Sequence, residues 1–258
     1  MSNAPAINPL STYENDTLVS QYAEFHYGDP AFGVPNFAKA MADLAAAAHI
    51  RHGNGSNGRA MDLGCATGRS SFELAKVFNT VIGIDFSAML IQVGTRLLET
   101  GSVRYTMPDE GELVSYHERR LDDLGLADAA KRVEFWQGDA CNLKGHFTGF
   151  DLILAANLID RLYSPRRFLD DVASRLNPGG LLVLGSPYTW MEDYTPRAEW
   201  IGGFKKDGES YTTLDGLKDI LGSQFELVQG PQAVPFVIRE TRRKHQHTLS
   251  EVTVWKRR

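Results

Sequence analysis

The run Asp62-Leu63-Gly64-Cys65-Ala66-Thr67-Gly68-Arg69-Ser70-Ser71 decides the fold. A short apolar segment, 60–63, leads into it and predicts a buried strand, and the segment 70–78 predicts a helix. Gly64 permits the tight turn between them, and Gly68 lets the helix approach the strand closely. A glycine-rich turn of this kind does not by itself identify a ligand.

The same alternation of strand and helix continues along the chain. Strands are expected over 60–63, 80–84, 133–137, 150–155 and 181–184, and helices over 70–78, 88–100 and 165–176. Strands that alternate with helices form parallel sheets with right-handed crossovers, so the expected fold class is α/β. The strand-like segments 225–228, 236–239 and 248–256 leave little room for helices and predict an antiparallel hairpin at the sheet edge.

Segments outside this alternation divide the chain further. The expected parts are an N-terminal helical lid segment, 1–52, and a main domain, 53–258, with inserts at 102–132 and 186–212. Asp16 and Asn36 are candidate helix caps in the lid segment. Long extra segments in a compact domain are usually functional or disordered.

Composition argues against several classes of partner. Lys plus Arg is 27 and Asp plus Glu is 32, so the net charge of −5 gives no reason to expect a nucleic acid. The chain has no apolar run of membrane-span length and no signal-peptide core, which favours a cytoplasmic protein. Cys65 and Cys141, like His245 and His247, lack further partners at metal-ligand spacing, so no metal site is expected.

A second acidic residue follows the next predicted strand. Asp85 ends the run Val81-Ile82-Gly83-Ile84-Asp85, where a carboxylate can accept hydrogen bonds from both hydroxyls of a ribose. The alternative is that Asp85 only caps the following helix. An NAD-dependent oxidoreductase is a competing enzyme class, but the spacing of Gly64 and Gly68 lacks the G-x-G-x-x-G pattern.

The pattern Asp-Leu-Gly-Cys-x-Thr-Gly at 62–68, followed by Ile84-Asp85-x-Ser87, resembles class I S-adenosylmethionine-dependent methyltransferases. The resemblance spans 60–184 and includes the turn Asn177-Pro178-Gly179-Gly180. It implies a Rossmann-like fold with a mostly parallel seven-stranded sheet. It also implies S-adenosyl-L-methionine as the cofactor and S-adenosyl-L-homocysteine as its product. One departure is Ala66, which stands where the family has its middle glycine.

This resemblance also implies which residues hold the cofactor. The glycine-rich loop would hold the methionine part, Asp85 the ribose, and Asp139 the adenine amino group. The alternative for Asp139 is a surface turn residue. The expected cofactor-binding residues are Asp62, Gly64, Cys65, Ala66, Gly68, Arg69, Asp85, Phe86, Ser87, Gly138, Asp139, Ala140 and Ala156.

The flanks resemble a narrower family, the methyltransferase domain of ovothiol biosynthesis. The residues that carry this resemblance are Tyr13-Glu14-Asn15-Asp16, Tyr22, Phe25-His26-Tyr27-Gly28, Phe32-Gly33-Val34-Pro35-Asn36-Phe37, Gly111-Glu112-Leu113, and the segments 62–66, 68–74, 238–241 and 251–255. The resemblance implies methylation of an imidazole ring nitrogen of 5-thiohistidine (mercaptohistidine) to give ovothiol A. It also implies a sulfoxide synthase or lyase of the same pathway as partner, with this chain as a stand-alone enzyme or an excised domain.

The acceptor pocket is expected beyond the fourth strand, at 155–161. Asn157 is the favoured contact to the imidazole, with a turn-stabilising role as the alternative. Arg161 and Arg239 are candidate carboxylate clamps, because a guanidinium offers a bidentate fork, and solvated surface arginines are the alternative. The candidate catalytic residues are Asn157, Tyr27 and His26, and the candidate substrate-binding residues are Tyr13, Tyr22, Asn157, Arg161, Tyr188 and Arg239.

The expected chemistry makes modest demands on the protein. The acceptor thiol can release the proton that the ring must lose, so a strong general base is not required. Two other functions stay open at this point. They are a methyltransferase of another small molecule and a non-catalytic module that binds S-adenosylmethionine.

Overall fold

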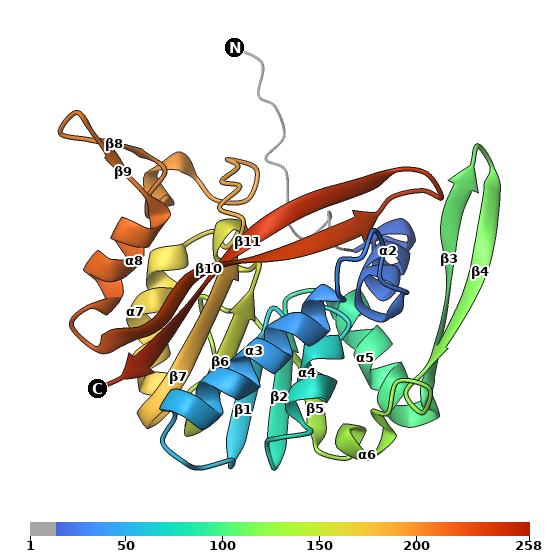
Figure 1. Cartoon of the computed structure of the whole chain (residues 1–258), viewed down its shortest axis with the longest axis horizontal. Helices are drawn as coiled ribbons and strands as arrows, with labels where there is room; N and C mark the ends of the chain where they lie inside the picture. Colours follow the sequence, from blue (N-terminus) through green and yellow to red (C-terminus); the bar gives the residue numbers. More distant parts are fainter. Residues whose placement is uncertain (1–13) are drawn as a thin grey trace.

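A seven-stranded sheet forms the centre of the computed structural model, which describes residues 14–258 (Figure 1). The strands lie in the order β10-β11-β7-β6-β1-β2-β5. Their bounds are β1 (Arg59–Leu63), β2 (Thr80–Asp85), β5 (Val133–Gln137), β6 (Phe150–Ala156), β7 (Leu176–Ser186), β10 (Phe225–Arg239) and β11 (His245–Arg257). Strands β5, β2, β1, β6 and β7 run parallel, and β11 is antiparallel to both β7 and β10. The expected α/β fold, with its antiparallel C-terminal hairpin, is confirmed.

The C-terminal hairpin differs from its prediction in one respect. The segments 225–228 and 236–239, expected as two strands, belong to the single strand β10. The pairing of β10 with β11 shifts register between Leu227 and Gln232, and the ladder resumes beyond this bulge. A local irregularity within β10 therefore looked like a break between two strands.

Helices flank the sheet, and one of the two predicted helix caps is confirmed. The helices are α2 (Asp16–Tyr27), α3 (Phe37–His52), α4 (Arg69–Leu74), α5 (Ala88–Thr100), α6 (Ala127–Ala130), α7 (Pro165–Arg175) and α8 (Thr213–Leu221), with 3-10 turns η1 (Ile159–Arg161) and η2 (Arg197–Glu199). Asn36 caps α3 as predicted, because its side chain accepts the Lys39 amide. Asn15, rather than Asp16, caps α2 by accepting the Leu18 amide.

Each face of the sheet packs against its own helices. Side chains alternate along a strand, so Ala60 and Met61 of β1 belong to different buried clusters. The first cluster includes Met41 of α3 and Phe72 of α4, and the second includes Phe168 of α7. Burial on both faces explains why the parallel strands read as continuous apolar runs.

The two inserts form hairpins outside the main sheet. β3 (Ser102–Glu110) pairs antiparallel with β4 (Leu113–Arg120), and Figure 1 shows this hairpin projecting beside α2. The second insert contains η2 and the short hairpin of β8 (Phe204–Lys206) and β9 (Glu209–Tyr211). The first insert is therefore placed to contact the N-terminal segment, and β3 does contact α2.

Candidate functional site

A cavity of about 510 Å³ opens where the parallel strands end. The carboxyl ends of β1, β2 and β6 reach it, and β1 lies between β2 and β6 in the sheet. Open α/β sheets bind ligands at such a switch point, beyond the carboxyl ends of the strands. The volume falls within the roughly 300–1,000 Å³ that is typical of small-molecule sites.

The structure brings most of the predicted site residues to this cavity. Those that line it are Tyr22, His26, Asp62, Gly64, Ala66, Asp85, Phe86, Ser87, Gly138, Asp139, Ala140, Ala156, Asn157 and Arg161. Those that do not line it are Cys65, Gly68, Arg69, Tyr27, Tyr188 and Arg239. Tyr13 lies outside the described residues. Only part of the N-terminal segment takes part, since α2 and the first turn of α3 reach the cavity while the rest of α3 packs on the sheet.

The glycine-rich loop turns sharply because its backbone repeatedly enters the left-handed region. The φ angle is +77° at Gly64, +46° at Ala66 and +89° at Gly68. Holding alanine rather than glycine in this region costs about 1 kcal/mol, so Ala66 is a strained position. The amides of Gly64 and Cys65 donate to the Ile84 carbonyl at 2.8 and 3.0 Å, which ties the loop to β2.

Gly68 is fixed by packing as well as by its backbone angle. A Cβ at Gly68 would lie 2.2 Å from Cζ of Phe135, and Cβ atoms at Gly83 and Gly94 would also meet that ring, at 2.6 and 2.9 Å. The Phe135 ring of β5 therefore fills space that three glycines leave open. Gly68 permits the close packing predicted for it, but it does so beneath the loop and not in the cavity wall.

Asp62, near the end of β1, is a buried carboxyl with two hydroxyl partners. Its Oδ2 accepts hydrogen bonds from Ser70 and Ser71, both at 2.7 Å. Burial raises the pKa of this carboxyl to about 6, against the lowering effect of the two hydroxyls. Asp62 is therefore ionised at neutral pH, where it can hold a cationic group.

The Asp85 carboxylate holds the glycine-rich loop from β2. Its Oδ2 accepts the Ala66 amide at 2.8 Å, and its Oδ1 accepts the Ser87 amide at 2.9 Å. Burial raises the pKa of Asp85. The N-cap of α5 is Ser87, whose hydroxyl accepts the Leu90 amide at 3.1 Å. Asp85 is thus not the cap of this helix, and its carboxylate faces the cavity.

Asp139 forms a third acidic position in the cavity wall. Its Oδ1 accepts the Cys141 amide at 2.8 Å, and its Oδ2 accepts the Tyr163 hydroxyl at 2.9 Å. Tyr163 also lines the cavity, although no motif in the sequence predicts it. These contacts hold the carboxylate in place, with a nucleobase amino group as its predicted partner.

Cys65 and Arg69, both predicted among the cofactor-binding residues, are buried and do not line the cavity. Arg69 pairs with Glu73 at 2.7 Å, and both side chains are almost fully buried. The Arg69 guanidinium also donates to the His26 carbonyl at 3.4 Å, so it joins α4 to α2. Burial raises the pKa of the Cys65 thiol, which stays protonated.

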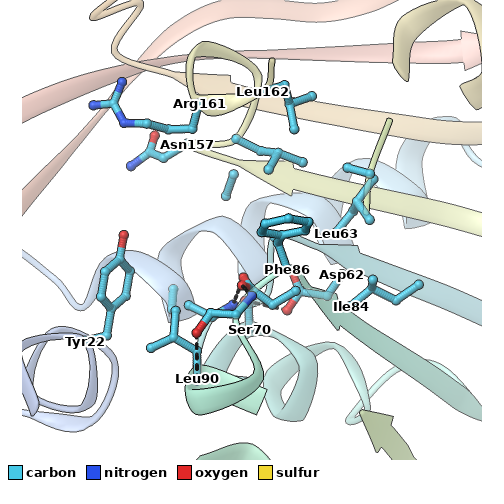
Figure 2. Close-up of a pocket in the computed structure, with 18 of the residues that line it drawn as sticks. Tyr22, Asp62, Leu63, Ser70, Ile84, Phe86, Leu90, Asn157, Arg161 and Leu162 are labelled. Atoms are coloured by element: carbon cyan, nitrogen blue, oxygen red, sulfur yellow. Dashed lines mark hydrogen bonds between the residues drawn. The ribbon is translucent and has the colours of Figure 1, made fainter. Parts of the chain in front are cut away.

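Asn157, Arg161 and Tyr22 line the end of the cavity beyond β6. Figure 2 shows Tyr22 across from Asn157 and Arg161, with Asp62 and Ser70 in a different part of the cavity. Burial raises the pKa of Tyr22 to about 12, and the charge of Asp85 adds to this effect, so its hydroxyl stays protonated. The cavity thus has an acidic half at β1 and β2 and a second half that includes Tyr22, Asn157 and Arg161.

Asn157 and Arg161 are both held by neighbouring residues. Asn157 adopts a left-handed φ of +53°, and its Oδ1 accepts the Ser250 hydroxyl of β11. Arg161 pairs with the buried Asp160 at 3.1 Å, and its second Nη donates to Oγ1 of Thr189 at 3.0 Å. Arg161 is therefore an anchored part of the wall rather than a freely solvated side chain.

His26 is buried at the edge of the cavity in neutral form. Burial and the nearby Arg69 charge lower its pKa to about 3. Its Nδ1 accepts the Arg69 amide at 3.4 Å, so Nε2 carries the ring proton. An imidazole with this pKa is a weak proton acceptor, and His26, a candidate catalytic residue, is better suited to donate a hydrogen bond than to act as a general base.

Tyr27, Tyr188 and Arg239 have other partners than those predicted. The Tyr27 hydroxyl donates to the Thr67 carbonyl at 2.7 Å beneath the glycine-rich loop. The Tyr188 hydroxyl donates to Glu251 at 3.0 Å. Arg239 pairs with carboxylates outside the cavity. None of the three lines the cavity, where a catalytic role was predicted for Tyr27 and substrate contacts for Tyr188 and Arg239.

Several cavity residues were missed because they come from distant segments. Phe25 of α2, Phe236 and Ile238 of β10, and Tyr194 of the second insert all line the cavity. The Arg161 guanidinium lies 4.9 Å from the centre of the Tyr194 ring. The alternation of Phe236 and Ile238 is the one sequence signal that would have placed two of them on a common strand face.

The structure adds two observations on other kinds of site. Among residues 14–258, no group of three or more His, Cys, Asp or Glu side chains is placed to hold a metal ion. In the described part of the chain, no helix combines the length and apolar character needed to cross a membrane.

Solved structures of other proteins share the fold of this chain. The chain can be superposed on a magnesium protoporphyrin IX methyltransferase from Synechocystis PCC 6803 with bound S-adenosylmethionine (TM-score 0.56, 14% identity, 100% of both chains). It also matches the N-methyltransferase NodS from Bradyrhizobium japonicum WM9 in complex with S-adenosylhomocysteine (TM-score 0.52, 16% identity, 94% and 99% of the chains). At these identities the likeness shows the fold, which is that of class I S-adenosylmethionine-dependent methyltransferases.

Sequence comparison then gives the family. A family model described as a methyltransferase domain matches residues 36–227, and the chain belongs to this family. A demethylmenaquinone methyltransferase of Clavibacter sepedonicus is 29% identical over 126 residues, which is 49% of this chain and 40% of that protein. The match thus spans less than half of that relative. S-adenosylmethionine is the cofactor that this family and fold imply for the cavity.

Proposed function

We propose that this protein is an S-adenosylmethionine-dependent N-methyltransferase that methylates an imidazole ring nitrogen of 5-thiohistidine to give ovothiol A. The observation that carries the proposal is the division of one cavity between Asp62 and Asp85 on one side and Asn157, Arg161 and Tyr22 on the other. The resemblance of the flanks to ovothiol methyltransferase domains supports the choice of substrate.

The acidic half of the cavity fits the cofactor by charge. S-adenosylmethionine carries a sulfonium and an ammonium against one carboxylate, and it supplies an electrophilic methyl group when bound. Asp62 would hold the ammonium, Asp85 the ribose hydroxyls and Asp139 the adenine amino group. The left-handed backbone at Gly64 and Ala66 forms the tight turn of the loop that lines this half of the cavity.

The second half of the cavity suits a small amino acid with a planar ring. Arg161 would bind the substrate carboxylate, Asn157 would donate its Nδ2 to the thiolated imidazole, and the Tyr22 hydroxyl would orient the ring. The aromatic side chains of Phe25 and Tyr194 would exclude water from the reacting atoms. Alignment and exclusion of water are the main contributions that a methyl transfer needs from the protein.

Proton removal follows from the state of His26. Because the pKa of His26 is lowered to about 3, this residue is not expected to accept the proton. The substrate thiol would instead release its proton to solvent, and the neutral His26 would donate a hydrogen bond from Nε2. A sulfoxide synthase or lyase of the same pathway would supply the substrate.

Mass spectrometry tests the proposal. Purified protein is incubated with S-adenosylmethionine and 5-thiohistidine, with histidine as the control. A gain of one methyl group on the thiolated compound alone is expected. Calorimetric binding of S-adenosylhomocysteine without methylation of either compound would overturn the substrate. It would leave a methyltransferase of another small molecule or a non-catalytic module. Absence of cofactor binding would overturn the proposal as a whole.

A further inference from the structure

Arg239 joins three separate elements beside the cavity. Its Nη1 lies 3.1 Å from Oε1 of Glu24 in α2, and its Nη2 lies 3.2 Å from Oδ1 of Asp109 in β3. The three side chains are only 19%, 10% and 22% exposed, so solvent and salt screen these pairs weakly. The backbone of Arg239 adds a further contact, because its carbonyl accepts the Gln21 side chain at 3.2 Å.

The β3–β4 hairpin holds the same helix at further points. The Tyr105 hydroxyl of β3 donates to Oε2 of Glu24 at 2.6 Å. Arg119 of β4 donates to both carboxylate oxygens of Asp29, two residues beyond the end of α2, at 3.3 and 2.9 Å. Glu24 is therefore the point at which α2, β3 and β10 meet.

The helix that Arg239 holds is also the helix that reaches into the cavity. Gln21 and Glu24 are three residues apart and share one face of α2, whereas Tyr22 and His26 are four apart and share another. Both Tyr22 and His26 line the cavity. Because a helix moves as a unit, release of Glu24 would displace Tyr22 and His26 from their places in the wall.

We propose that Arg239 is a positioning residue for the acceptor end of the cavity. By clamping Glu24 to Asp109, it holds α2 against the β3–β4 hairpin and so fixes where Tyr22 and His26 stand. Arg239 does not line the cavity and acts only through α2. The acidic half of the cavity is formed by β1, β2 and their loops and contains none of the three clamp residues, so we expect release of Glu24 to affect it less than it affects Tyr22 and His26. The assignment of this end of the cavity to the methyl acceptor rests on the proposed function.

The chain offers a matched control. Arg243 pairs with Glu110 at 2.6 Å, with exposed fractions of 70% and 69%, and so links the β10–β11 turn to the β3–β4 hairpin. This pair involves neither α2 nor the cavity. Arg239→Gln and Arg243→Gln each remove one cation between the same two hairpins. Only Arg239→Gln releases α2.

Hydrogen exchange of the α2 amides is the direct test, because it needs no knowledge of the substrate. Exchange over 16–27 should accelerate by at least about tenfold in Arg239→Gln, because a partly buried ion pair is broken. It should stay at the wild-type rate in Arg243→Gln, and Arg239→Lys should recover much of the protection. The same measurement on Glu24→Gln replaces it if Arg239→Gln does not fold. Unchanged exchange in Arg239→Gln, or in Glu24→Gln where that variant replaces it, would overturn the proposal.

Binding and kinetics then separate positioning from general damage. The Kd for S-adenosylhomocysteine should stay within about twofold of wild type in Arg239→Gln, because none of the clamp residues lies in the acidic half of the cavity. With 5-thiohistidine as the probe, KM should rise by about tenfold or more, with a smaller change in kcat. A loss of S-adenosylhomocysteine affinity equal to the rise in KM would overturn the proposal. If wild type does not methylate 5-thiohistidine, the proposed substrate fails, while exchange and cofactor binding still decide the role of Arg239.

Discussion

The carboxylate of Asp85 accepts the backbone amide of Ala66 at 2.8 Å, so the end of β2 holds the loop that leaves β1. The other carboxylate oxygen accepts the amide of Ser87, at the start of α5. One side chain thus fixes both backbone segments that border the acidic half of the cavity. Its replacement should affect the loop and the ligand together.

Asp85→Ala should weaken binding of S-adenosylhomocysteine by about 1–3 kcal/mol, because a partly buried acceptor of the ribose hydroxyls and the Ala66 amide is lost. Calorimetry measures this change directly. Asp128→Ala removes an exposed carboxylate paired with Lys131 and serves as the control. Wild-type affinity in Asp85→Ala would remove the ribose assignment.

The affinity for S-adenosylhomocysteine should rise as pH increases from 5 to 7. The pKa of Asp62 is raised to about 6, and a cationic amino group favours the ionised carboxylate. One pH unit below this pKa, about nine tenths of the carboxyls are protonated, and binding should be roughly tenfold weaker. Calorimetry in Asp62→Asn should give weak binding without this slope. The same slope in Asp62→Asn would assign the titration to another group.

The free energy of unfolding should respond to Asp62 in the opposite direction. A folded-state pKa of about 6, raised from 3.8, favours folding when the carboxyl is protonated. This contribution is fully present below about pH 4 and is lost as pH rises through about 6. Denaturant titrations of the ligand-free protein should therefore show a fall in stability over this window that is absent in Asp62→Asn. An identical pH profile in both proteins would contradict the raised pKa.

Ala66→Gly should increase the free energy of unfolding by about 1 kcal/mol, because glycine adopts the +46° φ of this position without strain. Ala40→Gly, inside α3, should lower it by about 1 kcal/mol through loss of helix propensity. Thermal denaturation of both variants checks the opposite signs. Destabilisation by both would show that Ala66 is not strained.

Gly68→Ala should be much more damaging than Gly101→Ala. Both glycines have positive φ, +89° and +71°, so both variants introduce backbone strain. Only Gly68 also faces the Phe135 ring, since nothing lies within 4 Å of a Cβ at Gly101. The additional cost should be about 1–3 kcal/mol. Phe135→Leu combined with Gly68→Ala should recover part of it, and equal melting temperatures for the two single variants would contradict the packing argument.

The strand and helix order and the acidic positions of the cavity were predictable from local patterns. Asp62 and Asp85 directly follow apolar runs, and parallel strands bring such residues to one edge of the sheet. The Gly64 and Gly68 turn likewise has a local cause, because only glycine adopts these angles without cost. The chemistry of this half of the site therefore depends on residues close together in sequence or register.

The acceptor half could not be derived in this way. Its wall combines Tyr22, Asn157, Tyr194 and Ile238, which lie on four segments that meet only through tertiary packing. Arg239 shows the difficulty plainly, because an arginine beside a predicted cavity suggests a ligand contact. The structure instead pairs it with Glu24 and Asp109, which are 215 and 130 residues away along the chain.

The hydrogen bond from the Tyr27 hydroxyl to the Thr67 carbonyl joins the helix of the acceptor half to the loop of the cofactor half. It is one direct contact through which a change at one site can reach the other. Thermodynamic reciprocity then applies to the two ligands. The factor by which bound cofactor raises the affinity for the acceptor must equal the factor by which bound acceptor raises the affinity for the cofactor. A single phenolic hydroxyl is thus a direct physical link between the two binding equilibria.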